Sequence, residues 1–460
     1  MRDGFRSIAA PPSTTYTTRV LEVKAGAETE VKDGGPGHQA DPEAEGHLPP
    51  LKTSQALYYS AGGIAGGLVF TMMNNALPLF LLSYTMPLGL PAFLNPGGPV
   101  PATIAALLTN ERSLFGGLIQ PFVGQLSDRT RSPIGKRSPY ILGGGLLSAL
   151  AICLLGFHPP FWAMVLAVTL SGIFLFVALG PYATLLADIA TPGTRGRIGG
   201  LMALAGVLGA VCFTVLSMLL WAQSKVVVFL LVAVGTVTSL AVVAFGVHEP
   251  PSLSLRPMQK ETVRDLWHEV AADKPLARYI AAMGVYWLGA GAAAPFITRF
   301  GVVELGVPEA NSFTLLLVIV LATAVGAVIS GYLADRYGKK RILQPALVLF
   351  AVAAMAGSQV RDVGVALPVM LLVGLGNAAP TALHIPLLAD LVDKQRAGAL
   401  MGFGNMVWSV AQPVGSLLAG TMVDFSGSYR WVFVFAAVCM AIAALMLSRV
   451  PNKSREAAGT

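Results

Sequence analysis

Charged residues are scarce in this sequence of 460 residues. They make up 12% of the chain, whereas about a quarter of the residues in soluble domains are charged. Hydrophobic residues reach 54%. This balance excludes a soluble globular protein and predicts a chain that lies in a lipid bilayer. The net charge of +7 does not indicate a nucleic-acid partner, because the basic residues stand in short loops between apolar runs.

Cysteine and histidine are also rare. Cys153, Cys212 and Cys439 all fall in apolar runs, so no disulfide framework is expected. The six histidines form no close pair at helical spacing and have no cysteine partner. The sequence has no Gly-Lys-Ser/Thr loop that could hold a phosphate group. We therefore expect no metal site, no cofactor, no use of ATP and no enzymatic activity.

Long apolar runs are what the sequence does contain. A helix needs about 20 predominantly apolar residues to cross a bilayer. Runs of this length predict eleven spans, and a twelfth at 104–127 requires Glu111 and Arg112 to lie inside it. The eleven are 55–84, 139–157, 161–187, 199–222, 226–247, 279–299, 311–334, 342–360, 364–389, 398–423 and 430–448.

Lysine and arginine are distributed unevenly among the loops. Loops after even-numbered spans and the C-terminal tail hold 20 of them, and loops after odd-numbered spans hold 4. Basic loops stay on the cytoplasmic side, so both termini are expected in the cytoplasm, in a bacterial inner membrane. Residues 1–54 have no apolar run of secretory-signal length and are expected to form a disordered cytoplasmic tail. Residues 449–460 are expected to form a second cytoplasmic tail.

A short basic loop occurs once in each half of the chain. Residues 124–137 read GQLSDRTRSPIGKR, and residues 331–341 read GYLADRYGKKR, with the Gly-and-Asp-Arg pattern 207 residues apart. A second repeat places Leu-Ala-Asp at the end of the fourth and tenth spans, each followed by arginine. Duplicated loops in a duplicated hydrophobic array predict an all-α membrane protein with twelve transmembrane helices in two pseudo-symmetric six-helix bundles, 55–248 and 277–448.

The connection between the halves, 249–276, also carries a pattern. Val263, Leu266, Trp267 and Val270 recur at helical spacing. This predicts either a helix that lies on the inner membrane surface or a solvated linker with one helical turn.

Together these features resemble the major facilitator superfamily over about residues 55–448. In that family the loop after the second span reads roughly G-x-L-(A/S)-D-R-x-G-R-(K/R), and the second copy matches it from Gly331 to Lys340. The first copy, with Gln120-Pro121 before it, looks like the sucrose–proton symporter group and the melibiose permease group. Aspartates of the melibiose group are replaced here by Gln120 and Gly116, and an arginine and an aspartate of the plant sucrose carriers by Ala183 and Gly172.

The resemblance implies a gate on the cytoplasmic side. Each loop aspartate would face a helix N-terminus of the other half, and a carboxylate there stabilises closure by about 0.3–1 kcal/mol. Topology alone, or capping and surface pairing, would also explain these residues. The predicted gating residues are Gly124, Asp128, Arg129, Gly135, Arg137, Asp188 and Arg195 in the first half and Gly331, Asp335, Arg336, Gly338, Asp390 and Arg396 in the second.

Polar residues inside the spans predict a central site. Glu111 and Arg112 suit an outer gate or a proton-titrated carboxyl group, or else an interfacial pair. His384 suits a substrate or proton site, or else a hydrogen bond between helices. Amides and aromatic faces suit a hydroxyl-rich ligand, with interhelical hydrogen bonding as the alternative. The further candidates are Asn74, Asn75, Gln120, Tyr182, Tyr286, Trp287, Asn377, Thr381, Asn405, Trp408 and Gln412.

We therefore expect a secondary transporter that works as a monomer, with a small-molecule substrate, protons and the lipid bilayer as its partners. Proton-coupled uptake of a sugar or glycoside is the first hypothesis. The alternatives are a proton-antiport exporter of amphipathic compounds and a membrane sensor that retains the fold without transporting.

Overall fold

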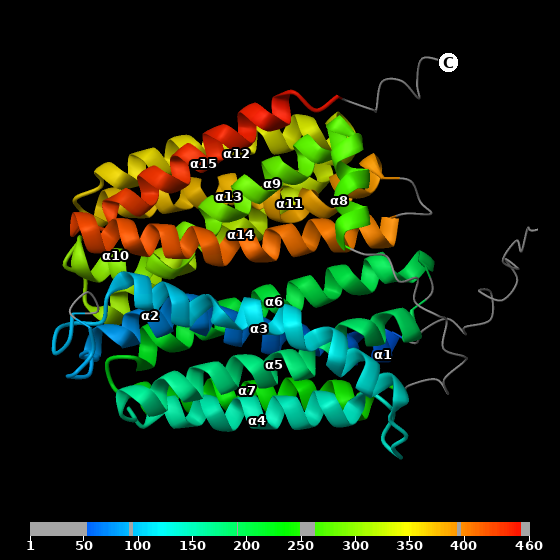
Figure 1. Ribbon diagram of the computed structural model, residues 1–460, viewed down its shortest axis with the longest axis horizontal. Helices are drawn as coiled ribbons and strands as arrows, with labels where there is room; N and C mark the ends of the chain where they lie inside the picture. Colours follow the sequence, from blue (N-terminus) through cyan, green and yellow to red (C-terminus); the bar gives the residue numbers. More distant parts are fainter. Residues whose placement is uncertain (1–52, 92–94, 191, 249–262, 393–396, 452–460) are drawn as a thin grey trace, which may run out of the picture. The chain divides into compact units, whose positions relative to one another are not determined.

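The computed structural model is built of helices, with no strand among the residues that it describes, which are 53–91, 95–190, 192–248, 263–392 and 397–451 (Figure 1). Within these ranges it does not describe the side chains at 111–118, 121, 128, 187, 192, 193, 195, 196, 263, 397 and 398. Eleven helical segments of the described part are long and apolar enough to cross a membrane. The twelfth is α3 (Ala102–Arg129), which is one continuous helix of 28 residues through positions 111 and 112, as predicted.

The first six segments form the N-terminal bundle. They are α1 (Thr53–Thr71) with its continuation through η2 (Met72–Ala76), α2 (Leu77–Phe80) and η3 (Leu81–Ser83), then α3, α4 (Ser138–Gly156), α5 (Phe161–Ile189), α6 (Pro192–Leu220) and α7 (Lys225–Gly246). The last six form the C-terminal bundle: α9 (Lys274–Ala293) with η5 (Ala294–Phe296) and α10 (Ile297–Val303), α11 (Glu309–Tyr337), α12 (Lys339–Gln359), α13 (Val363–Leu391), α14 (Ala397–Ser426) and α15 (Arg430–Ser448).

The two bundles repeat one packing scheme. In the N-terminal bundle, α1 packs on α6 and α7, α4 packs on α5 and α7, and α3 packs on α5. In the C-terminal bundle, α9 packs on α14 and α15, α12 packs on α13 and α15, and α11 packs on α13. Each pair in one bundle therefore has its counterpart in the other, which confirms the predicted duplication. Extensive packing between the bundles is confined to two pairs, α3 with α14 and α6 with α11.

The first helix of each bundle is broken at an equivalent place. Pro78 follows the π-helical segment η2, and Pro295 lies in the 3-10 segment η5. Proline cannot donate a backbone hydrogen bond, so a carbonyl group one turn earlier loses its partner. Near the second break, the Ser416 hydroxyl donates to the Gly291 carbonyl at 2.5 Å. In a membrane such replacement partners are what makes a broken helix tolerable.

The connection between the bundles contains a further helix. Residues 249–262 lie outside the described ranges, and α8 (Val263–Ala272) follows them, inside the segment for which a surface helix or a single helical turn was predicted. Trp267 is 60% exposed, and its ring lies 6.2 Å from that of Phe403 on α14. The place of α8 on a membrane surface stays a prediction, as do the tails at 1–54 and 449–460, most of which lie outside the described residues.

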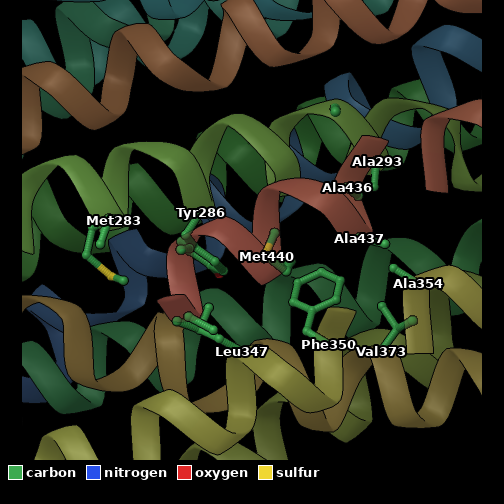
Figure 2. Packing of buried hydrophobic residues seen from close by; sticks show 14 of the residues in the cluster. Met283, Tyr286, Ala293, Leu347, Phe350, Ala354, Val373, Ala436, Ala437 and Met440 are labelled. Atoms are coloured by element: carbon green, nitrogen blue, oxygen red, sulfur yellow. The ribbon is translucent and has the colours of Figure 1, made fainter. Parts of the chain in front are cut away.

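The interior of each bundle is filled by apolar side chains. Figure 2 shows part of the largest cluster, in which Tyr286 of α9, Leu347 and Phe350 of α12, Val373 of α13 and Met440 of α15 pack together. These five residues are at most 6% exposed. Dense packing of this kind makes each bundle a rigid unit, and it leaves the surfaces between the bundles as the place for a functional site.

Candidate functional site

The two repeated loops follow α3 and α11, and both of these helices begin where the bundles contact one another, so the loops lie together at the opposite end. We name the end with the loops the motif face and the other end the far face. In each loop the second motif glycine turns the chain into the next helix. Gly135 has φ 109° and Gly338 has φ 95°, a region that other residues rarely adopt. Only glycine reaches this turn without strain, which explains why both copies carry it.

Each turn places a basic side chain beside the aspartate at the end of a neighbouring helix. Asp188, at the end of α5, pairs with Lys136 at 2.9 Å and with Arg137 at 3.0 Å. Asp390, at the end of α13, pairs with Lys339 at 2.7 Å. The sequence had linked these aspartates to Arg195 and Arg396, but the side chain of Arg195 and all of Arg396 lie outside the description.

The remaining motif residues form none of the described ion pairs. Arg129, Asp335 and Arg336 are exposed at the ends of α3 and α11, and the Arg336 guanidinium lies 5.4 Å from the centre of the Tyr337 ring. Asp335 and Asp390 line a cavity of about 240 Å³ at the motif face of the C-terminal bundle. A methyl group added at Gly124 or Gly331 would meet nothing within 4 Å. The side chain of Asp128 is not described.

His384 is the centre of an aromatic group between α13, α9 and α14. Its ring lies 5.6 Å from that of Trp287 and 5.2 Å from that of Trp408, edge to face in both cases. Its Nδ1 is 2.9 Å from the Pro380 carbonyl oxygen and 3.0 Å from that of Thr381. Because carbonyl oxygens only accept, Nδ1 carries a hydrogen, and Nε2 is the nitrogen that can take up or release a proton.

The two indole nitrogens beside His384 differ. Trp408 is almost fully buried, and its Nε1 donates to the Ile280 carbonyl at 3.3 Å. The Nε1 atom of Trp287 is buried and has no hydrogen-bond partner among the residues that the structure describes. Trp287 therefore holds an unused donor next to the one titratable ring of this group.

Several other candidates are engaged within one bundle. The buried Tyr286 hydroxyl donates to the Asn377 side chain at 2.7 Å, and the Thr381 hydroxyl donates to the Asn377 carbonyl at 2.9 Å. Tyr182 stacks on Tyr59 at 4.7 Å, and each hydroxyl donates to the other residue's carbonyl. The contacts of Tyr286 and Tyr182 are the interhelical hydrogen bonds considered as the alternative for these residues, whereas the contact of Thr381 lies within α13.

The last candidates are spread over three helices. Asn74 and Asn75 lie in η2 and donate to carbonyls one turn earlier. Each keeps a buried side-chain oxygen that has no partner in the described part of the chain. Gln120 and Gln412 are half-buried, and Asn405 is exposed. Glu111 and Arg112 lie on α3, but their side chains are outside the description. The structure thus brings together His384, Trp287 and Trp408. Tyr286 adjoins this group, because its ring lies 5.2 Å from that of Trp287, and it links Asn377 to the group. Thr381 contacts the His384 ring through its carbonyl oxygen. The other candidates have no described contact with the group.

Most of the residues that join the two bundles were missed by the sequence reasoning; Asn75 was a candidate, but it joins the bundles through its backbone carbonyl. Between described residues, every hydrogen bond and ion pair that crosses from one bundle to the other lies in the far-face half of the helices. The crossing pairs are Ala102 and Thr103 with Asp424, Asn110 with Ser416, Trp221 and Lys225 with Glu309, Asn75 with Thr298, Pro78 with Arg299, and Met218 with Thr314.

Arg299 is the most unusual of these residues, because a charged group inside an apolar span is costly. Its side chain is 0% exposed. The guanidinium donates to the Pro78 carbonyl of the other bundle and to the Tyr429 hydroxyl at 3.3 Å. Its position at the end of the seventh predicted span was the one available signal in the sequence.

Two related six-helix bundles that meet at one end, with polar and aromatic groups between their helices, define a polytopic membrane protein of the two-bundle transporter class. The chain belongs to the Major Facilitator Superfamily, whose family model matches residues 59–356 and 312–459.

Curated relatives match only part of the chain. The arabinose-proton symporter of Bacillus subtilis is 26% identical over 30% of this chain and 31% of its own length. The putative multidrug resistance protein MdtD of Yersinia pseudotuberculosis is 29% identical over 29% of each chain. An MFS-type transporter of the acurin A biosynthesis cluster of Aspergillus aculeatus is 28% identical over 34% of this chain and 27% of its own length. The chain thus matches about a third or less of these relatives.

Solved structures match the fold over most of the chain. A bacterial homologue of the human lysosomal transporter spinster, in an inward-facing and occupied conformation, gives a TM-score of 0.65 at 13% identity and covers 87% of this chain and 96% of that one. A mutant of the nucleoside transporter NupG gives a TM-score of 0.66 at 11% identity, with 86% and 98% covered. At such identities the likeness concerns the fold alone. The resemblance to the sucrose and melibiose groups stays a prediction.

Proposed function

We propose that this chain is a secondary active transporter that moves a small polar solute by rocking its two bundles about a central site. One observation carries the proposal: the described polar contacts that join the two bundles lie toward the far face. A carrier that exposes one site alternately to the two sides must close one end while the other is free. Polar contacts that hold the far face together are what one state of such a cycle requires.

The motif face is the cytoplasmic side in this proposal, and the state is inward-facing. The excess of Lys and Arg in the loops of that face supports the orientation. The spinster homologue with the same fold was solved in an inward-facing conformation, which is consistent with this assignment. The carrier works as a monomer, since each copy contains both bundles.

Protons are the proposed coupling ion, and His384 is the proposed proton carrier. A neutral His384 accepts a hydrogen bond at Nε2, and a protonated one donates there. A substrate hydroxyl can serve both forms, because it is donor and acceptor at once. Protonation of His384 therefore changes how the solute is held without removing its partner, and the unused Trp287 donor supplies a second contact.

The proposed substrate class is a sugar or glycoside. In the group around His384 the polar atoms belong to an imidazole and two indoles, with no carboxylate or ammonium group in the ring contacts. Such a surface suits a neutral ligand whose apolar ring face packs on aromatic rings and whose hydroxyls find hydrogen bonds. The arabinose-proton symporter among the relatives is consistent with this class.

Export of amphipathic compounds by proton antiport is the second candidate. The two tryptophans beside His384 also suit a planar apolar ligand, and a putative multidrug resistance protein is among the relatives. The two candidates differ in the direction in which solute and proton move.

The test uses purified protein in liposomes that contain a pH-sensitive dye, with protein-free liposomes as the blank. A panel of pentoses, hexoses, glucosides, galactosides and disaccharides is added outside. Acidification of the lumen on addition of one sugar class is the expected result. Uptake of labelled sugar without a pH change would overturn proton coupling, and the absence of both signals across the panel would favour the exporter.

A matched pair of variants tests the role of His384. His384→Gln keeps a polar side chain but cannot carry a proton, so we expect coupled acidification to fall at least tenfold. His268→Gln changes a histidine of α8, outside the central group, and is expected to leave transport unchanged. Acidification by His384→Gln at the rate of the parent protein would exclude His384 as the carrier.

A further inference from the structure

We propose that the N-termini of α3 and α11 are held by partners from the opposite bundle, and that these two contacts form a latch that keeps the far face closed. The latch consists of Asp424 with Ala102 and Thr103, and of Glu309 with Trp221 and Lys225. It rests on the proposed rocking of the two bundles and is independent of which solute is carried.

The first contact is a helix cap made between bundles. The residue before α3 is Pro101, whose side chain offers no cap. Instead one Asp424 carboxylate oxygen accepts from the Ala102 backbone N–H at 2.7 Å. The other accepts from the Thr103 backbone N–H at 2.9 Å and from its hydroxyl at 2.6 Å. A carboxylate that binds the unpaired N–H groups of a helix N-terminus stabilises both the charge and the helix.

The two helices approach closely where this cap forms. A methyl group on Gly420 of α14 would lie 2.8 Å from the Thr103 Cα atom, which is nearer than real contacts allow. Gly420 therefore permits the approach that brings Asp424, one helical turn later, onto the end of α3.

The second contact lies at the other interface between the bundles. Glu309 is the first residue of α11, and Pro308 before it offers no side-chain cap either. One carboxylate oxygen of Glu309 accepts from the Trp221 indole at 2.7 Å and pairs with the Lys225 ammonium group at 2.8 Å. Trp221 is 1% exposed and packs edge to face on Phe313 of α11 at 5.3 Å. The interaction is thus anchored in the apolar contact between α6 and α11.

The two contacts occupy equivalent positions in the duplicated fold. Ala102 and Glu309 both follow the proline that precedes a helix, and they are 207 residues apart, like the two motif loops. Trp221 and Asp424 are 203 residues apart, like Gly135 and Gly338. Donor and acceptor are exchanged between the two sites, since the carboxylate belongs to the C-terminal bundle in both.

Other helices of the protein are capped from within. The side chains of Ser224, Asp273 and Asp362 accept from backbone N–H groups of the helices that they begin, α7, α9 and α13. A cap within one helix survives when the bundles move apart, whereas a cap between bundles must break. The difference assigns a conformational role to Asp424 and Glu309 and a local one to Asp362.

The test measures how far the far face opens. Cys153, Cys212 and Cys439 are replaced by serine, and spin labels are placed on cysteines at Gln223, in the far-face turn after α6, and Arg361, in the far-face turn before α13. Distances are recorded by pulsed electron paramagnetic resonance in lipid nanodiscs. Asp424→Ala removes every acceptor of the first cap, and we expect the population with the longer distance to rise on the order of fivefold to tenfold.

Asp362→Ala is the matched control, because it removes a far-face cap that lies within one bundle. Its distance distribution is expected to equal that of the labelled parent. Thr103→Val, which keeps the shape and removes one donor, and Glu309→Gln, which removes the charge, carry the test if Asp424→Ala does not fold. They are expected to produce smaller increases of the same kind. Unchanged distances in the folded latch variants, or an equal change in Asp362→Ala, would overturn the proposal.

Discussion

The two ends of the bundles are held by opposite kinds of polar contact. At the motif face, the described ion pairs join Asp188 to Lys136 and Arg137, and Asp390 to Lys339, each within one bundle. At the far face, the carboxylates of Glu309 and Asp424 bind groups of the other bundle. The conspicuous charged motifs therefore brace each bundle, and less conspicuous residues join the bundles.

This comparison has a physical basis. In the proposed rocking cycle, a contact inside a bundle persists throughout, so it can be strong without slowing the movement of the bundles. A contact between bundles must form and break in each cycle, so its strength adds directly to the barrier. Single hydrogen bonds and partly exposed ion pairs contribute roughly 0.5–1.5 kcal/mol each, which suits contacts that a thermal fluctuation has to release.

The largest effect is expected from breaking the ion pairs that Asp188 forms with Lys136 and Arg137 in the N-terminal bundle. Arg137 has a side chain that is 6% exposed, and Asp188 is 24% exposed. Asp188→Asn would leave the Arg137 charge buried beside a neutral amide, which we expect to lower the free energy of unfolding by about 2–4 kcal/mol. The measurement is denaturant unfolding in detergent micelles, followed by tryptophan fluorescence.

The equivalent change in the other bundle serves as its control. Asp390 is 51% exposed and its partner Lys339 is 28% exposed, so solvent screens that pair. Asp390→Asn is expected to cost about 1 kcal/mol or less. Equal losses of unfolding free energy in the two variants would mean that the burial of Arg137 does not determine how much its ion pair stabilises the bundle.

A smaller loss of stability is expected from substitutions in the two glycine turns that place these basic side chains. At Gly338, with φ 95° and ψ 138°, alanine would be strained, and the same holds at Gly135 with φ 109°. We expect Gly135→Ala and Gly338→Ala each to lower the free energy of unfolding by about 1–2 kcal/mol. Gly124→Ala is the control, because it lies inside α3 with nothing within 4 Å of the added methyl group. A loss at Gly124 as large as at Gly135 would show that backbone strain is not the cause.

The sequence predicted the fold well because the bilayer restricts it. Apolar runs of spanning length can only be helices, and duplicated loops require duplicated bundles. Even α3 was predicted as a span despite Glu111 and Arg112, and it forms one continuous helix. The hydropathy pattern does not show where a helix breaks into η2 or η5, since that depends on partners from other helices.

The candidate site was predicted less completely, for a related reason. Helical spacing does not say which face of a helix meets which neighbour. Asn377 and Tyr286 were both candidates, and the structure shows that they bind each other inside one bundle. Asp188 is paired with Lys136 and Arg137 because the loop returns toward the end of α5, and this cannot be read from the distance along the chain. Glu309 and Asp424 carried no motif, so no sequence signal marked their partners.

The smallest expected effect concerns the motif aspartates as gate residues. Asp335 is exposed beside the cavity of the motif face, and its proposed partner is a helix N-terminus of the other bundle in the closed state. Such an exposed interaction contributes about 0.3–1 kcal/mol, so Asp335→Asn or Asp128→Asn should favour the inward-open state by only about twofold to fivefold. The measurement is labelling of a single cysteine introduced at Asn405, which is exposed on α14, with a maleimide reagent. We expect faster labelling in both variants and an unchanged free energy of unfolding. A gate residue shifts the balance between the two conformations, whereas an ion pair within one bundle changes the free energy of unfolding. Unchanged labelling would mean that the two loops serve topology alone, and the difference between the two faces would then rest on the far-face contacts.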